Sequence, residues 1–184
     1  MHRRQPLPRF WMMTDERQGE GLFPALERLP RGGGVVFRHY SLPDPERRCL
    51  FEEVTGAARR RGLLLMLGGE PELAATWGAE GSHGLCVGLP SAPGLLRSAP
   101  VHRLEELRAA EAVGAAFVFV SPVFPTRSHP DAAALGPQGF AAIAGQARVP
   151  VIALGGMNET KARSLSGLGM YGWAGIDAWA PEPD

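Results

Sequence analysis

Lysine is almost absent from this chain: Lys161 is the only one, and every other basic residue apart from histidine is an arginine. A site that binds an anion must therefore use arginine, backbone amides or hydroxyl groups. Basic and acidic residues number 19 each, so the formal net charge is zero. A chain without excess positive charge has no overall field that attracts nucleic acid or an anionic membrane surface. We therefore expect neither as a partner.

Cysteine and long apolar runs are also scarce. Cys49 and Cys86 are the only cysteines, and their spacing is not that of metal ligands. We expect both to be reduced, buried thiols in a cytoplasmic protein. The sequence predicts no membrane span and no signal peptide. Its 184 residues, 45% of them hydrophobic, are enough for the core of one domain.

The stretch 115–130, AAFVFVSPVFPTRSHP, changes abruptly from an apolar run to a polar loop. Residues 117–120 are aromatic or β-branched without polar alternation, which is typical of a buried strand in a parallel sheet. Pro122 and Pro125 end this strand, because proline cannot donate a ladder hydrogen bond. Residues 126–129 follow its carboxyl end, where parallel α/β folds bind ligands. An ordinary loop with incidental hydroxyls explains the stretch equally well.

Similar apolar runs alternate with amphipathic segments along the chain. Residues 89–94 contain two prolines, a serine and a glycine, so we expect the fourth helix to be reduced to a turn. The expected strands are 10–15, 35–40, 63–67, 81–87, 95–101, 117–120, 149–154 and 171–179. The expected helices are 22–29, 44–62, 71–77, 104–113, 137–147 and 158–165.

Eight buried strands that alternate with helices predict a compact parallel (β/α)8 barrel of the TIM type. Its fourth and eighth helices are expected to be degenerate. The barrel would span 10–179, with an amino-terminal tail at 1–9 and a carboxyl-terminal tail at 180–184. An open, doubly wound sheet is the alternative, but MTDERQGEG after the first strand lacks the G-x-G-x-x-G spacing that would favour it.

Gly155 and Gly156 follow the seventh expected strand. Two glycines let the backbone approach a ligand closely, and barrels frequently bind phosphate on amides after strands seven and eight. A phosphate cup is one interpretation of this dipeptide. A tight turn that needs positive φ angles is an equally good one.

The chain resembles the thiamine phosphate synthase and thiazole tautomerase superfamily over most of its length. The resemblance lies in GAAFVFVSPVFPTRSH, Gly136, PVIALGGMN and GWAGIDA, and extends to FWMMTD, VVFRHY, GAEGSHG and VHRLEELRAAEAVGA. It implies a (β/α)8 barrel that joins a magnesium-bound pyrimidine diphosphate to a thiazole phosphate. In such enzymes the protein contributes mainly charge stabilisation and positioning.

The resemblance also implies roles for individual residues. Arg38 falls on the arginine of the family's diphosphate motif, and Thr126 and Ser128 fall on the hydroxyl positions of its sixth-strand loop. The Gly-Gly pair falls on the cradle for the thiazole phosphate. The implied catalytic residues are Arg38, Ser128 and His129, and the implied substrate-binding residues are Thr126, Gly155, Gly156 and Asp177.

Several positions depart from the family. Val36 and Tyr40 stand where the diphosphate motif has glutamine and lysine, and the region of Gly68 and Gly69 stands where the family has its magnesium-binding Asn-Asp. No aspartate follows the fourth strand in HGLCVGLP, and His129 replaces the lysine after the sixth-strand loop. Since magnesium needs hard oxygen ligands, the chain by itself offers no metal site. We expect magnesium only together with a diphosphate substrate.

Further departures lie near the remaining strands. Asp177 replaces a small hydroxyl residue, and its carboxylate would repel a phosphate if it faced the cup. Pro100 replaces a serine two residues before His102. Pro122 stands where the tautomerase branch has its histidine, so that branch also lacks its key residue here.

Three functions therefore stay open: a divergent synthase, a thiazole tautomerase-like isomerase, and a non-catalytic barrel that binds a phosphorylated ligand. In each, the partner is a small phosphorylated heterocycle, and the sequence leaves a homo-oligomer open. An isomerase needs a histidine with a neighbouring carboxylate. We expect His83 and His102 to be structural or solvated. The candidates expected near strand ends on the ligand side are Asp15, His39, His129 and Asp177.

The missing carboxylates predict that the free protein does not bind Mg²⁺ tightly. Titration calorimetry with MgCl₂, first alone and then with a pyrimidine diphosphate present, measures this. Micromolar binding of Mg²⁺ to the protein alone would contradict the prediction.

Overall fold

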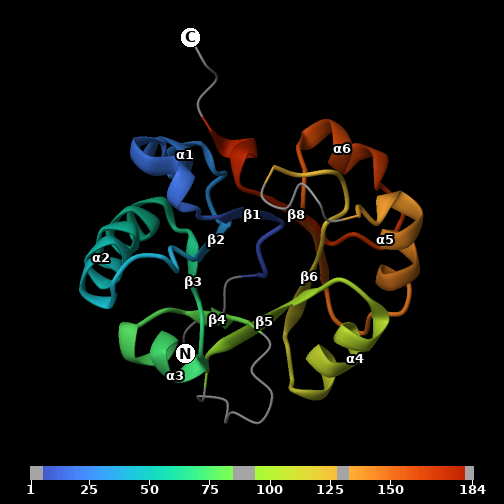
Figure 1. The fold of residues 1–184 in the computed structure, drawn as a ribbon, viewed down its shortest axis with the longest axis horizontal. Coiled ribbons are helices and arrows are strands. Elements are labelled where there is room, and N and C mark those ends of the chain that lie inside the picture. The colour runs from blue at the N-terminus through green and yellow to red at the C-terminus, as the bar shows by residue number, and fades with distance from the viewer. Residues whose placement is uncertain (1–5, 85–93, 128–132, 181–184) are drawn as a thin grey trace.

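The computed structural model describes residues 6–84, 94–127 and 133–180. Eight strands pair in chain order, every pair is parallel, and β8 returns to pair with β1, which closes the barrel (Figure 1). The closed parallel barrel expected from the sequence is therefore confirmed. The strands are β1 (Phe10–Met13), β2 (Gly34–Phe37), β3 (Leu64–Gly68), β4 (Gly81–His83), β5 (Leu96–Val101), β6 (Phe117–Val120), β7 (Val151–Ala153) and β8 (Gly172–Gly175).

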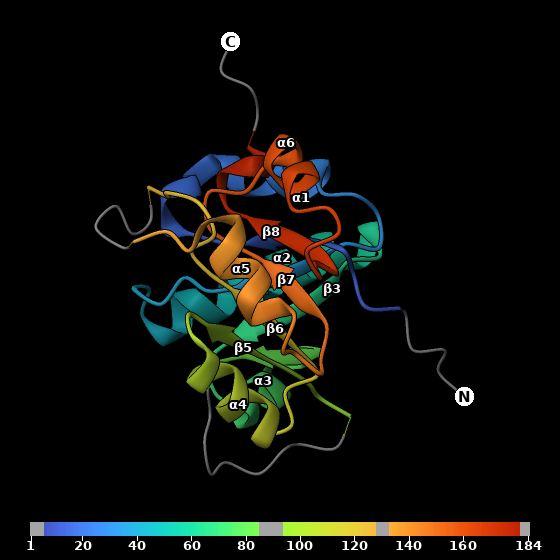
Figure 2. The ribbon, with the colours of Figure 1, turned by 90° about the vertical axis from the view of Figure 1, so that its right-hand side faces the viewer.

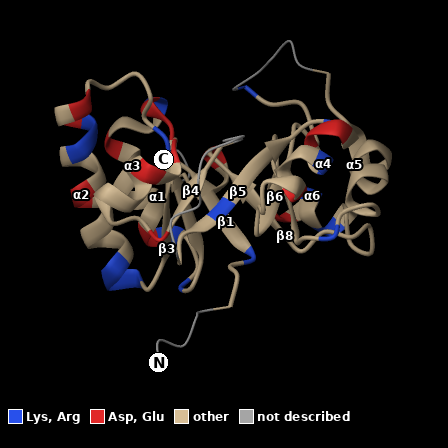
Figure 3. Ribbon diagram, turned by 90° about the horizontal axis from the view of Figure 1, so that it is seen from below, with Lys and Arg blue, Asp and Glu red and all other residues tan. Residues whose placement is uncertain are grey.

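Helices surround the strands on the outside of the barrel (Figures 1 and 2). The longest, α2, begins with acidic residues and ends with three arginines, an order that the helix dipole favours. Figure 3 shows its basic and acidic positions interspersed. The helices are α1 (Leu22–Arg28), α2 (Asp44–Arg61), α3 (Pro71–Trp77), α4 (Leu104–Ala112), α5 (Gly136–Ala144) and α6 (Glu159–Ser164), with two 3-10 helices, η1 (Glu16–Gly21) and η2 (Asp177–Trp179).

Several of the expected strands are shorter than the sequence predicted; β2 ends at Phe37 and not at residue 40, and β7 covers only Val151–Ala153. β1 ends at Met13, because Asp15 instead caps η1 and accepts a hydrogen bond from the Arg17 amide. β8 ends at Gly175, so Asp177 lies in η2 and not in a strand. In the described part of the fourth unit β4 ends at His83, and residues 85–93, where a shortened fourth helix was expected, lie outside the described residues.

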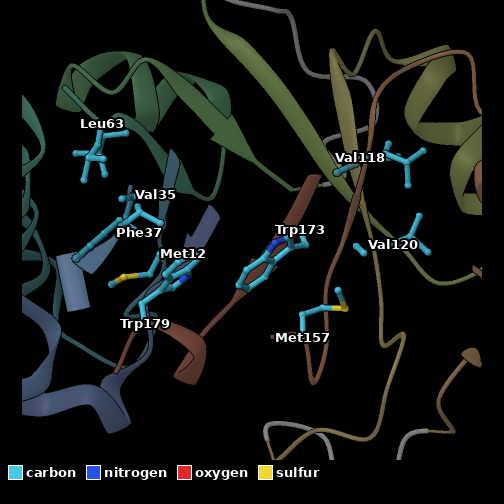
Figure 4. Close-up of a cluster of buried hydrophobic side chains, with 14 of the residues drawn as sticks. Met12, Val35, Phe37, Leu63, Val118, Val120, Met157, Trp173 and Trp179 are labelled. Carbon is cyan, nitrogen blue, oxygen red and sulfur yellow. The ribbon is translucent and has the colours of Figure 1, made fainter. Parts of the chain in front are cut away.

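The expected eighth helix is reduced to the single turn of η2. Trp179, at the end of this turn, packs on the barrel where a longer helix would otherwise lie. The Trp179 ring stacks on Trp173 of β8 at a centroid distance of 4.8 Å, and its indole N–H donates to the carbonyl of Trp11 at 2.9 Å. Figure 4 shows both rings within the outer apolar layer, together with Met12, Val35 and Phe37. This layer lies between the strands and the helices.

A second apolar cluster fills the inside of the barrel, as the alternation of side chains along the strands requires. Trp11 lies in it, fully buried, with its ring 4.9 Å from Phe117 and 5.5 Å from Phe119. The members of this interior cluster are Trp11, Met13, Val36, Leu64, Met66, Phe117, Phe119, Ile152 and Ala174.

Two other sequence expectations have clear outcomes. Cys49 is an exposed free thiol, so the prediction that it is buried is wrong, because its position on α2 faces away from the strands. Cys86 lies outside the described residues. Among the helices of the described ranges, none is both long and apolar enough to cross a membrane.

The fit between Trp11 and Gly34 yields a stability prediction. A Cβ atom at Gly34 would overlap the Trp11 indole, so Gly34→Ala overpacks the barrel interior and should lower the free energy of unfolding by about 1–3 kcal/mol. Gly56→Ala is the matched control, since a Cβ there meets only the Arg60 guanidinium at 3.6 Å. In the middle of α2 it should raise the free energy of unfolding by about 0.5–1 kcal/mol. Urea unfolding measures both, and equal effects of the two variants would contradict the packing argument.

Candidate functional site

A cavity of about 520 Å³ opens at the carboxyl-terminal ends of the strands. This is the face on which (β/α)8 enzymes bind their ligands, and the volume suits a small molecule. Its walls are mostly apolar, with a few polar groups converging from different strands. The lining residues are Met13, Arg38, His83, Pro100, His102, Ser121, Pro122, Thr126, Ala133, Leu135, Leu154, Gly155 and Ile176.

A smaller recess of about 60 Å³ adjoins this cavity, and we call it the cup. Four residues line both spaces, so the cup is a side pocket of the cavity. Its volume, roughly that of two water molecules, admits one small group and not a whole heterocycle. The cup is lined by Thr126, Leu154, Gly155, Gly156, Met157, Gly175, Ile176, Asp177 and Ala178.

The Gly-Gly pair is needed both for its backbone conformation and for close contact. Gly155 and Gly156 have φ angles of +92° and +59°, which favour glycine. A Cβ at Gly155 would lie 2.7 Å from Pro122 Cα, and one at Gly156 would lie 3.0 Å from the Phe124 carbonyl oxygen. The turn and the cup are therefore one feature, and neither amide N–H has an acceptor among the described residues.

Lys161 supports this turn from α6. Its ammonium group donates to the Gly156 carbonyl at 2.7 Å and lies 5.2 Å from the centre of the Phe124 ring. Asn158 caps the same helix by accepting from the Lys161 amide at 2.9 Å. The only lysine of the chain thus holds the backbone of the cup in place.

Arg38 lies on the β2 side of the cavity in a fixed orientation. Its Nε donates to the Thr14 carbonyl at 2.7 Å, and its Nη2 donates to the Asp15 carboxylate at 3.0 Å. Arg17 donates to the same carboxylate from its Nε at 2.6 Å. Partial burial by itself raises the Asp15 pKa, but the hydrogen bonds and charge of Arg17, with the charge of Arg38, lower it below its usual value. Asp15 therefore stays ionised and holds Arg38 at the rim.

His39, expected near the ligand, instead lies buried behind the rim. Its Nδ1 is 2.9 Å from the Thr14 hydroxyl, and its ring stacks on Phe37 at 4.9 Å. It has a φ of +43°, the one positive value among non-glycine residues of the described chain. Burial is the main cause that lowers its pKa, so it is neutral at pH 7. It does not line the cavity.

His83 and His102 do line the cavity, although the sequence predicted structural or solvated roles. His83 Nδ1 is 3.0 Å from the Ser98 hydroxyl, and His102 Nδ1 donates to the Ser121 carbonyl at 2.6 Å. In both rings these contacts engage Nδ1, and Nε2 has no hydrogen-bond partner among the described residues. Burial is the main cause that lowers the His83 pKa to about 4. Ser98 lies on β5 and Ser121 directly follows β6, so no local pattern signals either partner.

The remaining predicted site residues gather around the cup. Thr126 lines both the cup and the cavity, and Asp177 lines the cup. The Asp177 carboxylate pairs with the Arg127 guanidinium at 2.9 Å, and both side chains are exposed, at 50% and 78%. Ser128 and His129 lie outside the described residues.

The edge where the family's magnesium ligands were expected holds a buried cation instead. Arg47 donates from Nε to the Arg38 carbonyl at 2.9 Å and from Nη2 to the Gly68 carbonyl at 2.7 Å. The rings of Tyr40 and Trp77 enclose its guanidinium at 5.3 and 5.4 Å. No cluster of three His, Cys, Asp or Glu suited to a metal occurs within the described ranges. These residues do not fit a protein-bound magnesium ion.

Barrel, cavity and cup together define a (β/α)8 protein with a built site for a small ligand, and comparisons with known proteins give its family. Residues 92–179 match the family model of thiamine monophosphate synthase. The chain is 31% identical over 179 residues to a protein of Aquifex aeolicus that carries the name thiamine-phosphate synthase 2, with 92% of this chain and 96% of the relative covered. Thiamine-phosphate synthase of Chloroflexus aurantiacus is 28% identical over 184 residues, covering 92% of this chain and 84% of the relative.

Among solved structures, thiamine phosphate pyrophosphorylase from Pyrococcus furiosus has a TM-score of 0.78 at 29% identity, covering 95% of this chain and 88% of the other. The chain therefore belongs to the thiamine phosphate synthase family, as the resemblance of its motifs implied. It is a thiamine-phosphate-synthase-like protein of thiamine metabolism.

Burial of His83 predicts how stability depends on pH. The unfolded chain takes up a proton on this histidine below pH 6.5, whereas the folded chain does so only near pH 4. The free energy of unfolding should therefore fall as the pH falls from 6.5 to 4, by up to about 3 kcal/mol from this residue. His83→Asn keeps an amide donor near Ser98 and should flatten the fall. Urea unfolding at several pH values measures this, and an unchanged slope in the variant would contradict it.

Proposed function

We propose that this protein joins a pyrimidine diphosphate to a thiazole phosphate. The observation that supports this most strongly is the placement of anion-binding groups on opposite sides of one cavity. Arg38 follows β2 and Thr126 follows β6, and these strands are four positions apart in a closed barrel of eight. The cup lies at the ends of β7 and β8, with Thr126 after β6 in its wall. Two anionic groups can therefore be held apart, with apolar walls between them for the rings.

The proposed reaction forms a bond between the pyrimidine methylene carbon and the thiazole nitrogen. The bond from that carbon to the diphosphate oxygen breaks, and the diphosphate leaves with the electron pair. Arg38 stabilises the charge that develops on the leaving group, because its guanidinium is already oriented by Thr14 and Asp15. The Gly155 and Gly156 amides and Thr126 position the thiazole phosphate.

In this proposal no group of the protein binds magnesium directly. The carboxylates that would hold it are missing from the described residues, so the ion comes only with the diphosphate. The buried charge of Arg47 beside Gly68 adds a permanent positive field at that edge. We further propose that the protein acts in the cytoplasm, since Cys49 is an exposed free thiol that suits a reducing compartment.

An isomerase acting on a thiazole phosphate is the second candidate, and the histidine pair favours it. His83 and His102 line the same cavity, and each is anchored through Nδ1. Such a pair can remove a proton at one ring position and return it at another. Incubation with a thiazole phosphate alone in D₂O separates the two candidates. Deuterium uptake that His102→Gln abolishes would support the isomerase, and its absence would support the synthase.

The synthase proposal predicts thiamine phosphate and diphosphate as products when the protein meets both substrates and Mg²⁺. Arg38→Gln should lower kcat/KM at least about a hundredfold, because it removes a preorganised donor to the leaving group. Arg163→Gln is the matched control, since Arg163 is also an arginine in an ion pair but does not line the cavity. It should change kcat/KM by less than about threefold. No thiamine phosphate above the rate without enzyme would contradict the proposal.

A further inference from the structure

The Arg127–Asp177 ion pair lies beside the cup. Asp177 lines the cup from η2, and Arg127 follows Thr126, which lines both the cup and the larger cavity. The two residues come from β6 and β8 loops that are 50 positions apart in sequence, and the pair joins them at 2.9 Å. Arg127 therefore lies within side-chain reach of any anion that enters the cup.

This ion pair is well suited to exchange its partners. Arg127 is 78% exposed and Asp177 is 50% exposed, and pairs of this kind contribute little to folding stability. A guanidinium binds a phosphate through two parallel hydrogen bonds, and a phosphate monoester carries nearly two negative charges at neutral pH. A dianionic phosphate thus competes well with a single carboxylate for the same arginine.

The cup also needs a cation that the described residues do not otherwise supply. Its lining residues include no basic side chain, and Lys161 is committed to the Gly156 carbonyl. The Asp177 carboxylate adds a negative charge at the wall. Amide donors alone would have to offset both this charge and that of a phosphate.

We propose that Arg127 provides the positive charge that binds an anion in the cup. In the free protein, Asp177 pairs with Arg127 in place of that anion. An incoming phosphate monoester takes Arg127 from Asp177, and phosphate oxygens replace the carboxylate oxygen that Arg127 Nη2 contacts in the free protein. Asp177 thereby selects for ligands with two negative charges, because a neutral alcohol or a monoanion gains too little from Arg127 to displace the carboxylate. This inference deepens the proposed function and rests on it for the site of the thiazole phosphate.

Inorganic phosphate at constant ionic strength and pH 8 is the probe, measured by titration calorimetry. Arg127→Gln should weaken its binding at least fivefold, both in the natural chain and in the Asp177→Asn background. Asp177→Asn alone should strengthen it at least threefold. Arg163→Gln is the matched control, because it also removes the cation of an exposed ion pair but lies on α6 and lines neither the cavity nor the cup. It should change the Kd by less than twofold.

If the phosphate Kd of the Arg127→Gln, Asp177→Asn double variant lies within twofold of that of Asp177→Asn alone, the inference is overturned. All three substituted residues are exposed enough for the variants to fold, and equal melting temperatures without phosphate verify this. The thiamine phosphate assay separates the two proposals. If the natural chain makes thiamine phosphate and Arg127→Gln alters neither the phosphate Kd nor the KM for thiazole phosphate, only the inference fails. If no thiamine phosphate forms while phosphate binding still depends on Arg127, the synthase proposal fails and the anion site stands.

Discussion

The burial of Trp11 inside the barrel is the contact on which the rest of the structure depends. Its indole occupies the space that Gly34 leaves by having no side chain, and it packs against Phe117 from the opposite side of the barrel. The indole N–H donates to the Pro8 carbonyl at 2.8 Å, and the Trp11 carbonyl accepts from Trp179. One residue thus ties the entry of the chain, the interior and the final turn together. The strand ends that carry the site are fixed by this closure.

Positive charge at the mouth of the barrel is held by arginines in three different ways. Arg38 is oriented by a carboxylate and a carbonyl, whereas Arg47 is buried between aromatic rings and binds only main-chain carbonyls. Arg127 is exposed and paired with a single aspartate. Since a guanidinium is not deprotonated under any physiological condition, none of these charges depends on pH. The mouth of the barrel is therefore positively charged although the chain has only one lysine.

The fold was largely predictable because buried parallel strands have a strong local signal. Residues 117–120 and 71–77 form the strand and the helix expected of them, with the same bounds. The end of β8 was misjudged, since Ile176 and Trp179 continue the apolar run while the backbone already turns into η2. Apolar composition does not separate a strand from a short helix that packs its tryptophan on the same layer.

The site was less predictable, because it depends on contacts between distant segments. Arg38, Thr126 and the Gly-Gly pair were found from motif resemblance, and each lines the cavity or the cup. His83 and His102 were undervalued, since Ser98 and Ser121, which orient them, are 15 and 19 positions away. The sequence predicted that the Asp177 carboxylate would repel a phosphate if it faced the cup, but in the structure this carboxylate is paired with Arg127. No pattern in the sequence links those two residues.

The main-chain construction of the cup has a consequence for the evolution of this protein. Gly155 and Gly156 offer backbone amides at positions that no other residue can occupy without strain or overlap. Mutation cannot remove a backbone N–H by changing a side chain, except by introducing proline. The surrounding side chains, by contrast, can be exchanged by mutation, and Asp177 stands where the resemblance to the family implies a small hydroxyl residue. A lineage can therefore change which molecule it prefers while it inherits the same pair of hydrogen-bond donors.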